Sequence, residues 1–108
     1  MSVKLNTALG FAAKAGKIRG GDFTAEKLIK SGKTQLIIID SECSEATQSK
    51  WEQLCEHHAV KLLKLKSPGG CMGKPDNKIF AVNDSDFCNM ILQAASEQEN
   101  SNNDDINN

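Results

Sequence analysis

Four consecutive aliphatic residues at positions 36–39, which read LIII, restrict the possible folds of this chain more than any other feature. An uninterrupted β-branched run is typical of a strand that is buried on both faces. Such a strand needs cover on each side, and amphipathic helices supply it. The chain is therefore predicted to place helices on both faces of a sheet.

The segments around this strand alternate between helical and extended patterns. Apolar residues recur at helical spacing before it, as in Leu5, Ala8, Leu9 and Ala12. Asp22 is placed to cap a second helix, and Ser44 or a neighbour to cap a third. The predicted helices cover about residues 2–15, 23–31, 44–58 and 85–95, and the further strands about 60–65 and 78–82, with 17–20 as a short extended link.

Alternating helices and strands predict an α/β fold, a three-layer α/β/α sandwich with a mixed sheet of about four strands. A chain of 108 residues is long enough for one such domain, to which we assign residues 1–95. Residues 96–108 read SEQENSNNDDINN and show no apolar pattern. They are predicted to form a disordered acidic tail.

The net charge of −1 conceals an uneven distribution of charge along the chain. Residues 1–39 carry seven Lys and Arg against two acidic residues, and without the last twelve residues the chain has 13 basic and 10 acidic side chains. This mildly basic body favours a polyanionic partner, although lysines kept only for solubility would give the same balance. Because no apolar run could span a bilayer and the first residues lack a signal-peptide pattern, we expect a cytoplasmic protein without a membrane partner.

The cysteine and histidine pattern gives little support for a metal site or an enzyme. The four cysteines form no C-x-x-C pair. Cys55 lies close to His57 and His58, yet it shares a helical face with Trp51, which favours packing over metal binding. Cys43 precedes a helix, but its acidic neighbours oppose a nucleophilic role. With no phosphate-binding loop, dinucleotide fingerprint or triad pattern either, we predict no catalysis, metal or cofactor.

The stretch KIRGGDFTAEKLIK at residues 17–30 is the first candidate for a binding loop. Gly20 and Gly21 allow close approach of the backbone, and the following helix presents unpaired N–H groups at its N-terminus. Lys27 and Lys30 are predicted on the outer face of that helix, directed toward phosphate. A tight turn that uses glycine only for its backbone freedom would explain the same residues.

The stretch SPGGCMGK at residues 67–74 is the second candidate. Its glycines include Gly69 and Gly70, and between them and the next glycine stand Cys71 and Met72. Small residues and an exposed thioether could lie against an unstacked base or ribose. The alternative is a short helical turn that packs Met72 inward.

In this order the motifs resemble those of the ribosomal protein L7Ae/L30e family of RNA binders, above all its small bacterial YlxQ-like branch. In that branch LGLAxRAGK precedes a glycine-opened helix, then SGKAKLVLLAxDxS, then LGxxxGK before the last strand. The matching stretches here are residues 9–17, 31–39 with Ser44 after them, and 68–74. The likeness covers about residues 5–93, and three ordered segments make it more specific than any single motif.

The resemblance implies binding to a kink-turn, a sharply bent RNA helix with tandem sheared G·A pairs. The family's G-x-N-E-x-x-K motif falls on Gly21 and Lys27, with Phe23 and Thr24 in place of its Asn-Glu pair. Phe can only stack or pack, and Thr offers one hydroxyl, so base-edge hydrogen bonds are lost. The RNA-binding residues that we predict are Arg19, Gly20, Gly21, Asp22, Phe23, Thr24, Lys27, Lys30, Glu42, Gly69, Gly70, Cys71 and Met72.

The function expected from these observations is non-enzymatic binding of structured RNA, with ribosomal RNA as a candidate partner and a monomer as the expected state. Gly21 and Gly69 are expected to lie side by side. Positive side chains around them would hold the bent polynucleotide. The alternative is a protein-interaction module on the same scaffold, in which Phe23 and Met72 form an exposed apolar patch.

Overall fold

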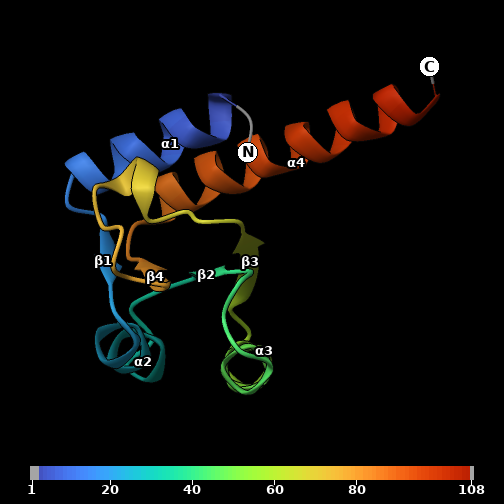
Figure 1. The fold of residues 1–108 in the computed structure, drawn as a ribbon. Helices are drawn as coiled ribbons and strands as arrows, with labels where there is room; N and C mark the ends of the chain where they lie inside the picture. The colour runs from blue at the N-terminus through green and yellow to red at the C-terminus, as the bar shows by residue number, and fades with distance from the viewer. Residues whose placement is uncertain (1–2, 108) are drawn as a thin grey trace.

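The computed structural model describes the backbone of residues 3–107 and the side chains of residues 3–97. Two helices cover each face of a central sheet, which gives three layers (Figure 1). The elements in chain order are α1 (Val3–Lys14), β1 (Ile18–Gly20), α2 (Asp22–Lys30), β2 (Leu36–Asp40), α3 (Glu45–His57), β3 (Lys61–Leu65), the 3-10 helix η1 (Gly70–Met72), β4 (Ile79–Val82) and α4 (Ser85–Asn107).

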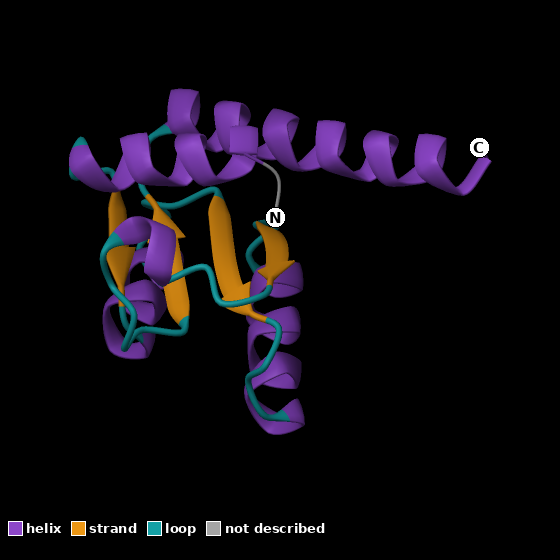
Figure 2. Ribbon diagram, turned by 45° about the horizontal axis from the view of Figure 1, so that its top comes forward, coloured by secondary structure: helices purple, strands orange, loops and turns teal. Residues whose placement is uncertain are grey.

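The sheet is mixed and has four strands in the order β1-β4-β2-β3, which confirms the predicted architecture (Figure 2). β2 runs parallel to β3, and β4 runs antiparallel to both β1 and β2. In this register Gly20 lies opposite Phe80, and Asp40 lies opposite Leu65. The ends of β1, β2 and β3 and the start of β4 therefore meet at one end of the sheet.

The strand β2 is buried on both faces, as its sequence predicts. Leu36 and Ile38 belong to the core cluster beneath α1 and α4. Ile37 and Ile39 belong to the second cluster, beneath α2 and α3. Because successive strand residues point to opposite faces, one run of aliphatic residues supports two cores. Each such side chain, when fully buried, contributes roughly 2 kcal/mol from the removal of apolar surface from water.

The helices follow the predicted faces closely. The four α1 residues that recur at helical spacing are all buried, and they pack in the same cluster as Ile91 of α4. Ser44 caps α3, where its side-chain oxygen accepts a hydrogen bond from the Thr47 backbone N–H at 3.2 Å. Asp84 caps α4 in the same way, through the Phe87 N–H at 3.0 Å. Local sequence signals therefore fix where these two helices begin.

Residues 18–20 form a strand, where the sequence predicts only an extended link. Ile18 pairs with Val82 and Gly20 with Phe80 across the antiparallel β1–β4 ladder. The Gly21 N–H continues this contact, because it donates to the Ile79 carbonyl at 2.8 Å. Three residues are too few to show a strand pattern of their own, so β1 depends on its partner strand.

The predicted cap of α2 is wrong. Asp22 lies inside the first turn of α2, and the N-cap is Gly21, which makes no side-chain cap hydrogen bond. The Asp22 carboxylate instead accepts hydrogen bonds from two α3 side chains, Lys50 Nζ at 2.8 Å and Trp51 Nε1 at 3.3 Å. The donors to the Asp22 carboxylate are thus an ammonium group and an indole N–H on a neighbouring helix, and not the backbone N–H groups of its own helix.

The helix α4 continues to Asn107, whereas the sequence predicts an irregular tail from residue 96. This segment contains neither Gly nor Pro, the two residues that most strongly end a helix. The last residue of the chain lies outside the described residues. The division of the chain at residue 95 stays a prediction.

None of the described helices combines the length and the apolar character that a membrane-spanning segment requires.

Candidate functional site

Three loops meet at the end of the sheet where β1, β2 and β3 end. They are the turn from β1 into α2, the turn from β2 into α3, and the long connection over residues 66–78. All three contribute to a shallow hollow of about 400 Å³. The hollow is lined by Gly21, Asp22, Glu42, Cys43, Ser44, Thr47, Asp76, Asn77, Lys78 and Ile79.

Gly21 opens α2 in a conformation that favours glycine. Its φ of +109° lies in a region that side chains rarely adopt, and no heavy atom would come within 4 Å of a Cβ built there. The backbone at this turn therefore faces open space. With no side chain capping α2, the helix N-terminus offers a site for hydrogen-bond acceptors and negative charge.

The two glycine loops reach the same end of the molecule and approach each other at Lys74, the last residue of the second stretch. A Cβ on Gly20 would meet the Asn77 side-chain amide and Cδ of Lys74. A Cβ on Gly69 would meet the backbone oxygens of the same two residues. The segment over residues 74–77 thus lies against both glycines. A Cβ on Gly69 would collide with backbone atoms, whereas a Cβ on Gly20 would meet side-chain atoms that can move.

The second glycine loop turns its apolar side chains inward, contrary to the predicted contact with a base. Met72 is only 5% exposed and packs in the cluster with Leu5 and Leu9 of α1. Cys71 is half-buried, and its thiol donates to the Pro68 carbonyl at 3.1 Å. The loop is the short helical turn that was the alternative interpretation, because Met72 gains more from the core than from water. Of the four predicted RNA-binding residues in this loop, Gly69 and Met72 are buried, Cys71 is half-buried and Gly70 is exposed.

The outer face of α2 carries an aromatic ring next to a lysine. Phe23 is 81% exposed, and Lys27 follows it one helical turn later, also exposed. Thr24 beside them is half-buried. Among the described side chains no ion pair involves Lys27, whereas Lys30 is bound to Glu26 at 3.0 Å. Lys27 is therefore the α2 lysine that is free to meet a ligand.

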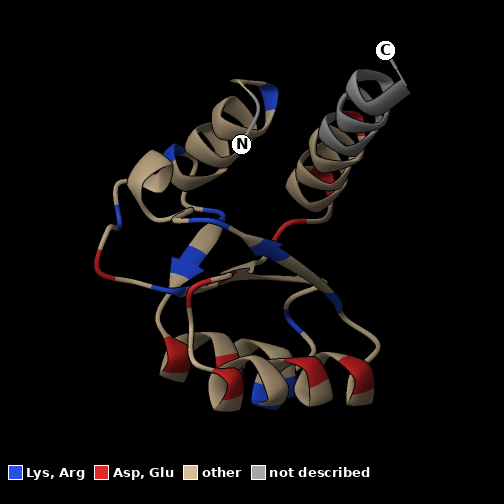
Figure 3. Cartoon of the chain, turned by 45° about the vertical axis from the view of Figure 1, so that its right-hand side comes forward, with Lys and Arg blue, Asp and Glu red and all other residues tan. Residues whose placement is uncertain are grey.

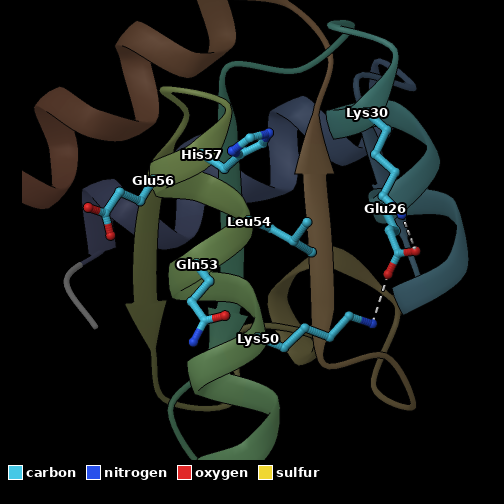
Figure 4. Close-up of a pocket in the computed structure, with 7 residues that line it drawn as sticks. All are labelled: Glu26, Lys30, Lys50, Gln53, Leu54, Glu56 and His57. Carbon is cyan, nitrogen blue, oxygen red and sulfur yellow. Dashed lines mark hydrogen bonds and ion pairs between the residues drawn. The ribbon is translucent and has the colours of Figure 1, made fainter.

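An ion-pair network links α2 to α3 behind this face (Figure 4). Lys50 of α3 lies 2.8 Å from an oxygen of Asp22. It also lies 2.8 Å from an oxygen of Glu26, and Figure 4 shows this second contact. Hydrogen bonds from Lys50 and then from Lys30 lower the pKa of the Glu26 carboxyl. The same bonds to Asp22 and Glu26 raise the pKa of Lys50. Lys50 thus neutralises the acidic side chains that stand closest to the opening of α2.

This network borders a broad open hollow of about 790 Å³ between α2 and α3 (Figure 4). Its lining is mixed in charge and polarity, with Leu54 as the apolar contribution: Glu26, Lys30, Lys50, Gln53, Leu54, Glu56 and His57. Nothing in this arrangement favours one class of ligand.

The titration of Glu26 tests the network. Replacing Lys50 with methionine is expected to raise the Glu26 pKa toward its ordinary value, because the largest stabilising partner of the carboxylate is lost. The matched variant Lys30→Met should raise it less, since Lys30 is the second partner. Side-chain carboxyl NMR over a pH series measures both shifts. A larger effect of Lys30→Met would contradict the described geometry.

The charge around the loop hollow is mixed, not uniformly positive. Asp22, Glu42 and Asp76 face Lys78 across it, and Lys78 lies 3.5 Å from the buried Asp40. Acidic and basic segments also interleave along the layer of α2 and α3 (Figure 3). Arg19 of β1 and Lys27 of α2 do not line the hollow, but both side chains are exposed.

The thiols have the character of packing residues. Burial raises the pKa of the Cys43, Cys71 and Cys88 thiols, and it raises the pKa of Cys55 to about 11. Such thiols are largely protonated at neutral pH, which opposes nucleophilic chemistry. Within the part of the chain that is described, no group of three His, Cys, Asp or Glu side chains could hold a metal ion.

Sequence reasoning missed Lys50, Lys74 and Asn77. Lys50 lies 28 positions after its partner Asp22, and the contacts of Gly20 with residues 74 and 77 span more than fifty positions. No local pattern reports pairs at such separation. The one signal in the sequence that could have drawn attention to Lys50 was its position on the helix that follows the buried strand.

Comparison with known proteins places the chain among a defined set of relatives. A family model described as the ribosomal protein L7Ae/L30e/S12e/Gadd45 family matches residues 3–91. RNA-binding protein YlxQ of Bacillus subtilis (strain 168) is 28% identical over 87 residues, which are 78% of this chain and 87% of that protein.

Solved structures share the fold. A protein with unknown function from Bacillus halodurans superposes with a TM-score of 0.81 at 22% identity, covering 86% of this chain and 97% of that one. The Giardia lamblia 15.5 kD RNA binding protein superposes with a TM-score of 0.68 at 16% identity, covering 90% and 86%.

Proposed function

The chain belongs to the ribosomal protein L7Ae/L30e/S12e/Gadd45 family, and on that premise we propose that it is a non-enzymatic protein that binds structured RNA. One relative, YlxQ of Bacillus subtilis, is named as an RNA-binding protein. The observation that carries the proposal for this chain is the exposed Lys27, which no ion pair among the described side chains engages, on the helix that opens at the uncapped turn of Gly21. A free cation on a helix whose N-terminal N–H groups lack a side-chain cap suits a run of phosphates.

We further propose a sharply bent RNA, such as a kink-turn or a bent element of ribosomal RNA, as the class of ligand. The support is the convergence of three loops at one end of the sheet, together with exposed basic side chains on the two elements that flank the first loop, Arg19 of β1 and Lys27 of α2. The two helical arms of a bent RNA can contact different loops of such a surface, whereas a straight duplex presents a single face. The monomeric state and the cytoplasmic location stay predictions.

Base readout differs from the family's pattern. Phe23 and Thr24 stand where the family has its Asn-Glu pair, and Asp22 is held by Lys50 and Trp51. None of these side chains offers the two-sided hydrogen bonding of an amide next to a carboxylate. We therefore propose that phosphate contacts supply most of the affinity, and that binding weakens steeply with salt.

The alternative function, a protein-interaction module on the same scaffold, loses the main argument in its favour. It requires Phe23 and Met72 to form one exposed apolar patch, but Met72 is buried in the core beneath α1. The patch reduces to a single aromatic ring. Docking surfaces for proteins are typically several hundred square ångströms of contiguous apolar surface.

Replacing Lys27 with glutamine tests the proposed function. The expected result is about tenfold weaker binding to a kink-turn RNA, together with a salt slope that is smaller by about one, because one phosphate contact is lost. Fluorescence anisotropy with the labelled RNA at several salt concentrations measures both quantities.

The matched control is Lys61→Gln, which changes an exposed lysine at the opposite end of the sheet, where β3 begins. It should leave affinity and salt slope near those of the parent protein. Equal losses in the two variants would mean that positive charge acts only through the whole field, and binding no tighter to the kink-turn than to a straight duplex would refute the bent-RNA proposal.

A further inference from the structure

The ring of Phe23 stands alone on the surface around the candidate site. The large hydrophobic side chains that are exposed within the described part of the chain are Val3, Phe11 and Phe23. Val3 and Phe11 belong to α1, on the other face of the sheet (Figure 1). Phe23 therefore has no exposed apolar neighbour at its own end of the molecule.

The surroundings of Phe23 suit one flat aromatic ligand that carries negative charge nearby. Gly21, two positions earlier, leaves open space at the start of the helix. Lys27 lies one turn along the same face, roughly 6 Å further along the helix axis. The two acidic residues of α2 are already paired, Asp22 with Lys50 and Trp51 and Glu26 with Lys30 and Lys50. A nucleotide has both required parts, because its base offers a π-face and its phosphate offers the charge.

We propose that Phe23 stacks on a single unpaired nucleobase of the bound RNA while Lys27 contacts a phosphate next to it; this rests on the proposed function. A phenyl ring covers about one base face and makes no base-edge hydrogen bond. The contact is therefore tolerant of sequence but selective for pairing state, because a base inside a duplex already has both faces stacked. Recognition at this position depends on where the RNA leaves a base unpaired.

Phe23 lies outside the core, so its effect on binding can be tested separately from its effect on folding. Its side chain is 81% exposed and belongs to neither core cluster, so its replacement should leave the fold intact. Phe23→Leu keeps an apolar side chain but removes the ring, and Phe23→Trp keeps an aromatic ring. The full-length chain is used throughout, and circular dichroism verifies that each variant is folded.

The probe is an RNA hairpin with one bulged 2-aminopurine nucleotide, and its control is the same hairpin without the bulge. Phe23→Leu is expected to bind the bulged hairpin about tenfold more weakly and the paired hairpin unchanged, whereas Phe23→Trp should stay within about threefold of the parent. The parent protein should change the fluorescence of the bulged base on binding, and Phe23→Leu should not. The salt slope should be unaltered in Phe23→Leu, in contrast to Lys27→Gln.

Two failures can be told apart. If the parent protein binds neither hairpin nor the kink-turn RNA, the proposed function fails and the stacking contact fails with it. If the parent binds the bulged hairpin but Phe23→Leu binds it equally well, or if the 2-aminopurine signal is the same for both proteins, the stacking contact is refuted while RNA binding stands.

Discussion

Replacing Trp51 with alanine is expected to lower the free energy of unfolding by about 4 kcal/mol, through lost burial and the cavity left behind. Trp51 is fully buried at the centre of the core beneath α2 and α3. It also donates a hydrogen bond from Nε1 to Asp22, which ties α3 to the first turn of α2 at 3.3 Å. Because Trp51 is the single tryptophan of the chain, urea unfolding should be followed by circular dichroism instead of fluorescence.

Trp51→Phe separates the two contributions. Phenylalanine fills much of the same space but lacks the N–H donor, so a smaller loss of about 1–2 kcal/mol is expected. Lys50 still holds the Asp22 carboxylate in that variant. If Trp51→Ala were within 1 kcal/mol of the parent, the description of this core would be wrong.

Gly69→Ala is expected to lower the free energy of unfolding by about 2–3 kcal/mol, because the new methyl group has no room. Its position overlaps the backbone oxygen of Lys74 and lies 3.1 Å from that of Asn77. Backbone atoms cannot rotate aside as the end of a side chain can, so the connection over residues 66–78 must shift. Urea unfolding measures the loss, and changed NMR shifts at residues 74–77 would locate it.

The neighbouring glycine supplies the control. Gly70 has no heavy atom within 4 Å of the position of a Cβ, so Gly70→Ala should change stability by less than about 0.5 kcal/mol. Two adjacent glycines of the same motif are thus expected to respond very differently. Equal effects of the two substitutions would show that the conformation of this loop, and not the contact with residues 74 and 77, decides the outcome.

The parts of the fold that follow from local periodicity could be predicted from sequence. The buried run at residues 36–39 and the four apolar positions of α1 report their own environment, because the spacing of apolar residues fixes which face is covered. Ser44 and Asp84 likewise mark helix starts, because each side chain caps a backbone N–H only three residues further along the chain. The three-layer architecture follows from these elements together.

The parts that depend on distant partners could not be predicted. Ile18 and its two neighbours become a strand only because β4 lies beside them. Asp22 has the composition of a helix cap, yet Lys50 and Trp51 reach it from another helix. A pattern of nearby residues contains no information on such pairings.

The candidate site shows the same limit in its second loop. Gly69 does mark a tight backbone position, whereas Gly70 has open space around it. Sequence could not decide the direction of Met72, which suits either an exposed contact or a core position. Phe23, by contrast, is 81% exposed, as both the RNA-binding and the protein-interaction interpretations of the sequence require.

The strand order leaves β1 and β3 at the two borders of the sheet, and both are unsuited to pairing with another chain. β1 is three residues long, which is too short a template for an added strand. β3 carries exposed lysines at positions 61 and 64, the second of them paired with Glu52, and charged side chains on an edge strand discourage the addition of another strand. The sheet is thereby protected from edge-to-edge polymerisation, so concentrated samples should resist conversion to fibrils even though the central strand is composed almost entirely of aliphatic residues.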